Sequence, residues 1–315
     1  MLGPLRPILR RILPGRIYET LRVFKSHVLG GSIPSMITRA EAEFYAATAA
    51  ARVGKPGVIV DLGCWMGSTS IALARGVLRA PAGRRSNERI VAYDLFVWQD
   101  WMASAQVRGV YRNGESFLPE ARRLVRDHGG GLIELVRADL TQIEWPGEPI
   151  KILLVDAMKS AALSRQIVRA FFPALPGGAL VVHQDFKHFY TPWIHLIHSE
   201  LRDHFRHAHN LRGSGTVAFE LQAPIPVAAL ERAIEFESRS ADQVAADFDY
   251  GMSLVEPAER CNIAAAHIMH YVHLRQLDPA QALLERYRAH GFDRAGEFPL
   301  AVRRLEALAR SRSSS

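Results

Sequence analysis

Residues 58–70, VIVDLGCWMGSTS, constrain the fold more than any other stretch of the chain. The apolar run ending at Asp61 predicts a buried parallel strand, Gly63 and Gly67 predict a tight turn, and Ser68 begins a helical pattern. Such a unit places backbone N–H groups and the positive end of a helix dipole where a nucleotide-like ligand can approach. The loop lacks both Gly-x-Gly-x-x-Gly and a following Lys-Ser/Thr pair, so no phosphate site is predicted. Asp61 suits a ligand with a cationic amine, and an ordinary structural turn is the alternative.

Further apolar segments predict the rest of a parallel sheet. Strands are expected at 89–94, 132–139, 150–156, 179–183 and 215–221, and helices at 39–53, 115–128, 160–172 and 192–206. Thr38 and Glu41 have the spacing of a capping box that opens the first of these helices. Because strands alternate with helices, the sheet should be parallel with right-handed crossovers, and its ligands should lie at the carboxyl ends of the strands.

Aspartates gather at these predicted strand ends. They are Asp61, Asp94, Asp139, Asp156 and Asp185. Carboxylates at one edge repel one another unless a cation or hydrogen-bond donors lie between them. The sequence therefore predicts a functional site along this edge.

Composition limits the compartment and the partners. The chain of 315 residues has two cysteines, Cys64 and Cys261, which form no motif, so a reducing cytoplasmic location is expected. No apolar run reaches membrane-spanning length. The formal charge is +7, but residues 1–30 alone contribute about +5 and residues 301–315 about +3, which leaves the centre nearly neutral. A nucleic-acid enzyme usually carries its basic stripe on the catalytic domain, so no nucleic-acid partner is expected.

The two ends differ from the centre in organisation as well as in charge. Residues 1–38 form a basic N-terminal extension, predicted as short helices packed on the main domain or as a peripheral contact of residues 1–30 with an anionic membrane. Residues 39–222 form the α/β domain. Residues 223–315 begin with prolines and continue as a helical appendix that could cap the site or mediate homo-oligomerisation.

Residues 58–78, VIVDLGCWMGSTSIALARGVL, resemble the first motif of class I S-adenosylmethionine-dependent methyltransferases, and more narrowly of the macrocin-type sugar O-methyltransferases. The resemblance covers about residues 40–221. It implies a Rossmann-like α/β fold whose seven-stranded sheet has the order 3-2-1-4-5-7-6, with the last strand antiparallel. The cofactor it implies is S-adenosylmethionine, held by Asp61, Gly63, Gly67 and Ser68 at the methionine part, Asp94 at the ribose hydroxyls, Asp139 at the adenine amine, and Asp156. A carboxylate suits a vicinal diol because it can accept from both hydroxyls.

Residues 156–159, DAMK, resemble the D-x-x-K motif of catechol-type, metal-dependent O-methyltransferases. This resemblance implies that Asp156 binds Mg²⁺ and that Lys159 deprotonates the acceptor hydroxyl, although the sugar enzymes have His at that last position. Gln184 and Asp185 would complete the metal set, with Gln184 standing where the family has an acidic ligand. An amide oxygen is acceptable to magnesium but contributes less charge. A solvated lysine at a helix start is the alternative for Lys159.

Aromatic and histidine side chains on the loops after the second and fifth strands are predicted to contact the acceptor. They are Trp98, Trp101, His183, His188, Tyr190 and Trp193. Aromatic faces suit a sugar ring or a planar phenol, and a hydrophobic lid is the alternative. His195 and His198, three apart on a predicted helix, have the spacing of a transition-metal pair, but no third ligand accompanies them.

The favoured function is therefore an S-adenosylmethionine-dependent O-methyltransferase, assisted by Mg²⁺, that acts on a small hydroxylated acceptor such as a sugar or a glycosylated natural product. The alternative is a non-catalytic binding module of the same fold, tethered to a membrane or a partner by its basic N-terminus and helical tail. A nucleic-acid methyltransferase is disfavoured by the neutral centre and by DAMK, which stands where an N-P-P-Y-type loop would follow the fourth strand.

Overall fold

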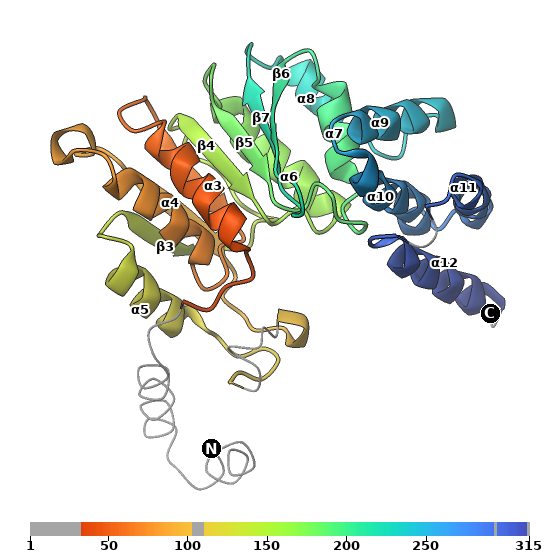
Figure 1. Ribbon diagram of the computed structural model, residues 1–315, viewed down its shortest axis with the longest axis horizontal. Coiled ribbons are helices and arrows are strands. Elements are labelled where there is room, and N and C mark those ends of the chain that lie inside the picture. The colour runs from red at the N-terminus through yellow and green to blue at the C-terminus, as the bar shows by residue number, and fades with distance from the viewer. Residues whose placement is uncertain (1–32, 103–109, 293–294, 314–315) are drawn as a thin grey trace, which may run out of the picture.

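The computed structural model describes residues 33–102, 110–292 and 295–313 of the chain. Within them, seven strands form one sheet of order β3-β2-β1-β4-β5-β7-β6 (Figure 1). β7 runs antiparallel to both β5 and β6, and the other neighbours pair in parallel. The predicted α/β architecture and strand order are confirmed. The predictions made for residues 1–30 lie outside the described residues.

The elements follow one another in the alternating order expected of such a sheet. The strands are β1 (Val58–Leu62), β2 (Ile90–Asp94), β3 (Ile133–Arg137), β4 (Ile150–Val155), β5 (Leu180–His183), β6 (Phe205–Asn210) and β7 (Val217–Leu221). The helices of the α/β part are α3 (Arg39–Ala50), α4 (Ser68–Leu78), α5 (Leu118–His128), α6 (Ala161–Phe171) and α7 (Trp193–Glu200). Those of the appendix are α8 (Val227–Ala233), α9 (Ala241–Ser253), α10 (Arg260–His273), α11 (Leu277–Ala289) and α12 (Phe298–Ser313).

Helices cover both faces of the sheet, as Figure 1 shows. In β1, Ile59 packs with side chains of α3 and α4, whereas Val58, Val60 and Leu62 pack with those of α6. Alternate residues of a strand point to opposite faces, so a strand buried on both faces must be apolar nearly throughout. Asp61 is the only polar residue of β1 and is fully buried. Packing alone does not explain a buried carboxylate in an otherwise apolar strand, so the carboxyl end of β1 is a candidate functional position.

The helical appendix is continuous with the α/β part and lies beyond α7, on the side away from β3 (Figure 1). One hydrophobic cluster contains Phe171 of α6, Leu196 of α7, Phe248 of α9 and Ile263 of α10. Lys187 adds a buried polar link, because its ammonium donates to Glu259 at 2.7 Å and to Asn210 at 2.8 Å. The appendix therefore shares a hydrophobic core with the α/β part.

The helix predicted at 192–206 is wrong in its second half. α7 ends at Glu200, and β6 begins at Phe205 and pairs with β7 alone at the edge of the sheet. An edge strand shows little alternation of apolar residues in its sequence, since much of it faces solvent.

The capping box of Thr38 and Glu41 is confirmed at the start of α3. Among the described residues, no helix combines the length and the apolar character needed to cross a bilayer.

Candidate active site

The carboxyl end of β1 holds a buried carboxylate with one unused oxygen. Asp61 Oδ2 accepts from Thr69 Oγ1 at 2.6 Å and from Ser70 Oγ at 2.5 Å, both in the first turn of α4. Asp61 Oδ1 has no donor among the described residues. Burial raises the pKa of Asp61 to about 6. Since a buried acceptor without a donor costs about 1–3 kcal/mol, a ligand that brings a donor or a positive charge to Oδ1 would be stabilised.

Two glycines bring this loop close to its neighbours. Gly63 has φ +86°, and a Cβ there would lie 2.4 Å from the carbonyl oxygen of Asp156. Gly67 has φ +87° and precedes Ser68, the first residue of α4, with no side chain capping the helix start. Only glycine adopts such φ values without strain and permits such an approach. The β1 loop and the loop after β4 therefore touch at the point where the predicted cofactor and acceptor sides meet.

Asp94, at the end of β2, ties two loops together. Its carboxylate accepts from Trp65 N at 2.9 Å and from Phe96 N at 2.7 Å. Trp65 and Phe96 both have left-handed backbones, with φ +47° and +52°. Such conformations are uncommon for large residues, cost about 1–3 kcal/mol each, and cluster at functional sites. Burial raises the pKa of Asp94, and a carboxylate keeps lone pairs for further donors after accepting two N–H groups.

Asp139 and Ser68 differ from these two in exposure. Asp139 is exposed, and it accepts from Thr141 N at 2.9 Å and Thr141 Oγ1 at 2.8 Å, which lower its pKa. Ser68 is half-buried at the first position of α4. Their predicted contacts with the adenine amine and with the methionine part stay predictions.

The acceptor side is built around one ammonium and two carboxylates. Lys159 Nζ lies 2.6 Å from Asp156 Oδ1, also contacts Asp185 Oδ2, and lies 3.5 Å from the Tyr190 hydroxyl. Tyr190 in turn donates to Asp185 Oδ1 at 3.0 Å. The structure thus brings together four residues of the predicted site: Asp156, Lys159, Asp185 and Tyr190. The sequence predicts metal binding for Asp156 and Asp185, proton transfer for Lys159 and acceptor contact for Tyr190.

The three ionisable groups of this cluster, Asp156, Lys159 and Asp185, differ in how their pKa values are shifted. Burial would lower the pKa of Lys159, but Asp156 and Asp185 outweigh burial and raise it well above its ordinary value. Burial raises the pKa of Asp156, and Lys159 only partly opposes this rise. Burial would also raise the pKa of Asp185, but Lys159 and His188 outweigh it and the pKa is lowered. Lys159 is therefore an ammonium near neutral pH, and Asp156 is the group of the three that most readily takes up a proton.

The predicted metal ligands do not fit a divalent ion in this arrangement. Lys159 already forms ion pairs with both Asp156 and Asp185, and the amide oxygen of Gln184 accepts from the Tyr45 hydroxyl at 3.4 Å. In the described part of the chain, no group of three or more His, Cys, Asp or Glu side chains is arranged to hold a metal. The cation that contacts the two carboxylates here is the Lys159 ammonium.

Two of the predicted acceptor contacts are core residues instead. Trp98 is 2% exposed and stacks on Tyr111 with ring centroids 5.2 Å apart. Trp193 is 5% exposed, and its indole N–H donates to the carbonyl oxygen of Met158 at 2.6 Å. The predicted contact of these two rings with an acceptor finds no support here, because both rings are buried among other side chains. Trp193 instead supports the loop that carries Lys159.

His183, also predicted to contact the acceptor, lies in the core instead. It is fully buried, and its Nε2 lies 2.7 Å from Nε2 of His198. Burial lowers the pKa of His183 to about 3, so the ring is neutral and one ring donates to the other. His195 is also fully buried, with Phe186 and Phe248 against its ring. These histidines belong to the packing between the sheet and α7 and do not face an acceptor.

Two predicted contacts remain at the site, and a third is exposed. His188 and Tyr190 stack with ring centroids 5.3 Å apart beside Asp185 and Lys159. Trp101 lies in a short 3-10 helix (Asp100–Met102) and is 70% exposed. Its role toward an acceptor stays a prediction.

Sequence reasoning missed Glu297, which precedes α12 and accepts from His188 Nδ1 at 2.7 Å. It also missed Tyr45 of α3, whose hydroxyl lies beside Gln184. Neither residue belongs to a motif, and Glu297 is 109 positions from His188, so no local pattern could have indicated the contact.

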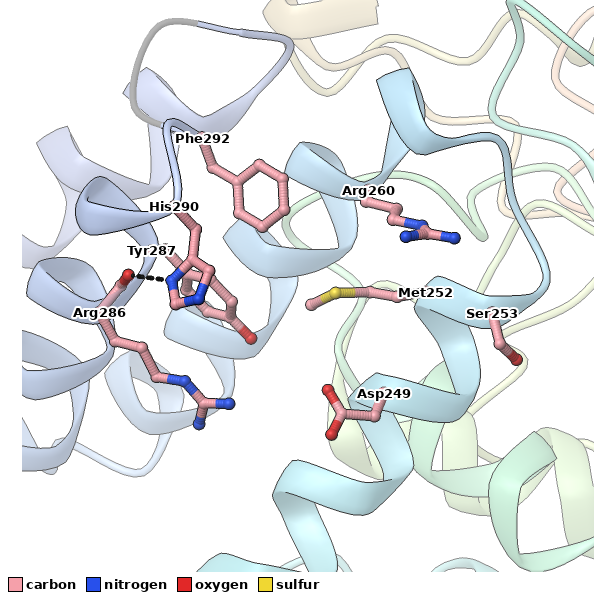
Figure 2. A pocket seen from close by; sticks show the side chains of 8 residues that line it. All are labelled: Asp249, Met252, Ser253, Arg260, Arg286, Tyr287, His290 and Phe292. Carbon is pink, nitrogen blue, oxygen red and sulfur yellow. Dashed lines mark hydrogen bonds between the residues drawn. The ribbon is translucent and has the colours of Figure 1, made fainter.

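A cavity of about 330 Å³ lies elsewhere, between helices of the appendix (Figure 2). Its lining includes Asp249, Met252, Arg260, Arg286 and Tyr287. None of the strand-end carboxylates borders it, so it is separate from the site at the edge of the sheet.

A comparison with protein families gives no match, and neither does a comparison with curated proteins. Among solved structures, the O-methyltransferase NovP is 17% identical with a TM-score of 0.47, over 60% of this chain and 82% of that one. The calicheamicin methyltransferase CalS11 is 18% identical with a TM-score of 0.45, over 68% and 96%. An O-methyltransferase from Bacillus cereus in complex with SAH is 13% identical with a TM-score of 0.39, over 69% and 96%. These likenesses are too distant to say what this chain binds or does.

Proposed function

We propose that this chain is an S-adenosylmethionine-dependent O-methyltransferase that acts on a small hydroxylated acceptor, such as a sugar or a glycosylated natural product. The observation that carries the proposal is the contact between two parts of the site. Gly63, in the loop suited to a cofactor, lies against the backbone of Asp156, which belongs to the group suited to handling a proton. Methyl transfer needs these two functions side by side, because the acceptor oxygen must lie in line with the methyl group.

The residues of the cofactor side fit S-adenosylmethionine. Asp61 has an unused buried oxygen for the cationic amine of the methionine part, and Asp94 can accept from the ribose hydroxyls. Asp139 is assigned the adenine amine, which agrees with its position after β3. The cofactor, when bound, supplies an electrophilic methyl group on a sulfonium.

On the acceptor side, each residue of the cluster has a distinct task. Asp156 takes the proton of the acceptor hydroxyl as that oxygen becomes the nucleophile, because it lies beside Lys159 at the end of β4 and burial raises the pKa of this carboxyl. Lys159 stays an ammonium, holds Asp156 and Asp185 in place and donates toward the acceptor oxygen. Tyr190 and His188 form one wall of the acceptor site. This differs from the sequence prediction, in which Lys159 itself is the base.

Assistance by Mg²⁺ is implied by the D-x-x-K resemblance alone, the side-chain arrangement does not support it, and it can be tested separately. Lys159 would become a base only if another cation took over the two carboxylates. We expect turnover to survive dialysis against EDTA, since Lys159 is the built-in cation. Loss of turnover in EDTA and recovery with added Mg²⁺ would show that the metal displaces the lysine.

Calorimetry with S-adenosylhomocysteine and S-adenosylmethionine tests the proposal directly. We expect both to bind, and turnover to release S-adenosylhomocysteine in the presence of some members of a panel of glycosides and free sugars. A panel of phenols and an RNA oligonucleotide serve as comparison acceptors. If neither cofactor form binds the full-length protein, the proposal is wrong.

The second candidate is a non-catalytic module of the same fold. It is favoured by Lys159, whose ion pairs occupy both carboxylates that chemistry would need. Cofactor binding without turnover on any acceptor would support it. Its tether to a membrane, through residues 1–30, predicts that the full-length protein floats with vesicles of anionic lipid at low salt and stays behind with vesicles of phosphatidylcholine alone.

A further inference from the structure

The residue just before α12 reaches the acceptor side of the sheet. Glu297 uses both carboxylate oxygens there: Oε1 accepts from His188 Nδ1 at 2.7 Å, and Oε2 accepts from Phe189 N at 2.9 Å. Bonds to an ionised acceptor are stronger than bonds between neutral groups. One appendix residue thus fixes both a side chain and the backbone of the loop after β5.

Glu297 is itself held firmly by the appendix. Its backbone N–H donates to Asn262 Oδ1 of α10 at 2.8 Å. A Cβ on the preceding Gly296, which has φ +56°, would lie 2.0 Å from the same Asn262 oxygen. The close seating of this turn on α10 gives the Glu297 side chain a defined origin. A functional group is positioned most accurately when the element that carries it is rigid.

The contact has consequences across the acceptor side. His188 Nδ1 lies against the Glu297 carboxylate, and Nε2 on the other side of the same ring lies 3.7 Å from Asp185 Oδ1. A Cβ on Gly215 would lie 3.0 Å from Nε2, so the ring is closely confined on that side as well. The other face of the His188 ring stacks on Tyr190, which bonds Asp185. Turning the His188 ring would therefore disturb Tyr190 and Asp185 together.

We infer that Glu297 is a positioning residue of the acceptor side, through which the helical appendix sets the orientation of His188 and of the loop at residues 185–191. The inference rests on the proposed function for its catalytic meaning. It gives the appendix a part in acceptor recognition. It also predicts that cofactor binding, which depends on Asp61 and Asp94 at the other end of the site, is independent of Glu297.

The test compares three variants of the full-length protein. Glu297→Ala removes both accepted bonds, Glu297→Gln keeps one carbonyl oxygen that can serve one donor, and Glu306→Gln changes an exposed residue of the same helix. For the glycoside that the wild type turns over best, we expect kcat/KM to fall about 10- to 100-fold in Glu297→Ala, as for supporting groups around other sites, and less in Glu297→Gln. The dissociation constant of S-adenosylhomocysteine should stay within about twofold of the wild type in all three, a change of under about 0.5 kcal/mol.

Two signals report on the positioning without any acceptor. Nitrogen-15 NMR of the His188 ring shows which nitrogen carries the proton, and hydrogen exchange of the Phe189 amide shows whether its bond persists. Both should change in Glu297→Ala and not in Glu306→Gln. Wild-type signals and kinetics in Glu297→Ala would overturn the inference. If the wild type bound no cofactor, the proposed function would fail, while the NMR and exchange measurements would still decide the role of Glu297.

Discussion

The two sides of the site are assembled in different ways. On the cofactor side, Asp61 accepts from hydroxyls eight and nine positions away, and Asp139 accepts from a residue two positions away. On the acceptor side, Lys159 meets Asp185 across 26 positions, and His188 meets Glu297 across 109. The cofactor side is built mostly from contacts between residues close in sequence, although Asp94 accepts from Trp65 N across 29 positions, whereas the acceptor side also uses Glu297 of the appendix. Specificity for the acceptor can therefore change without disturbing the cofactor site.

The largest effect is expected on the acceptor side. Asp156→Asn removes the proposed proton acceptor, so kcat at saturating S-adenosylmethionine should fall about 10²- to 10⁴-fold, the usual contribution of general acid–base catalysis. Asp203→Asn changes an exposed carboxylate and is the matched control. Turnover close to the wild type in Asp156→Asn would show that another group accepts the proton of the acceptor hydroxyl.

The next effect concerns stability on the cofactor side. Burial raises the pKa of Asp61 from its ordinary 3.8 to about 6, so the ionised carboxylate opposes folding and stability should increase as the pH falls from about 7 toward 4. At pH 8 the penalty is about 3 kcal/mol, from a shift of about two units, and Asp61→Asn should be more stable than the wild type by up to that amount.

Urea denaturation of both proteins between pH 4 and 8 measures this difference, which should vanish at the acid end. The same variant should lose affinity for S-adenosylhomocysteine, because the amide brings no charge to the amine. A constant difference across the pH range would mean that Asp61 does not titrate as the burial predicts.

A paired experiment ranks the carboxylates of the cofactor side. Asp94→Asn should weaken S-adenosylhomocysteine binding about 10- to 100-fold, because the buried charge that can accept from ligand hydroxyls is lost. Asp139→Asn should have a smaller effect, since Asp139 is exposed and screened by water. Calorimetry on both variants measures the order. A larger loss in Asp139→Asn would place the adenosine part nearer to β3 than we propose.

The smallest effect tests the support of the acceptor side. Trp193→Phe removes the hydrogen bond from Trp193 Nε1 to the Met158 carbonyl and should lower the free energy of unfolding by about 1–2 kcal/mol. Trp101→Phe, at a ring that is 70% exposed, should leave stability unchanged. Equal urea midpoints in the two variants would show that the indole bond does not hold the Lys159 loop.

The sequence predicts the strands and the glycine turn of the proposed cofactor side because periodicity and glycine spacing act over short distances. Strand ends, the turn at Gly63 and the strand-end carboxylates follow from the pattern of apolar residues alone. The expectation that a cation or donors must separate those carboxylates is also confirmed, although the donors come from the chain itself: Thr69 and Ser70, backbone N–H groups, and Lys159.

The acceptor side could be predicted only in part. An aromatic residue on a loop has the same local sequence whether its ring faces a ligand or the core, and only packing separates Tyr190 from Trp98 and Trp193. The extent of burial likewise decides whether Lys159 or Asp156 is the proton acceptor. Glu297 carries no local pattern at all, because its role depends on where α10 places the start of α12.

The link between Lys187 and Glu259 ties the loop after β5 to the appendix by a buried ion pair. The Lys187 side chain is 1% exposed, and its ammonium depends on a carboxylate that lies in the appendix. Removing one partner of such a buried pair typically costs about 3–5 kcal/mol, a large share of the stability of most domains. A fragment ending at residue 222 would keep all seven strands and leave the Lys187 ammonium without its Glu259 partner. The sheet and the appendix are therefore separate in chain order but not in stability, and we expect them to unfold in one transition.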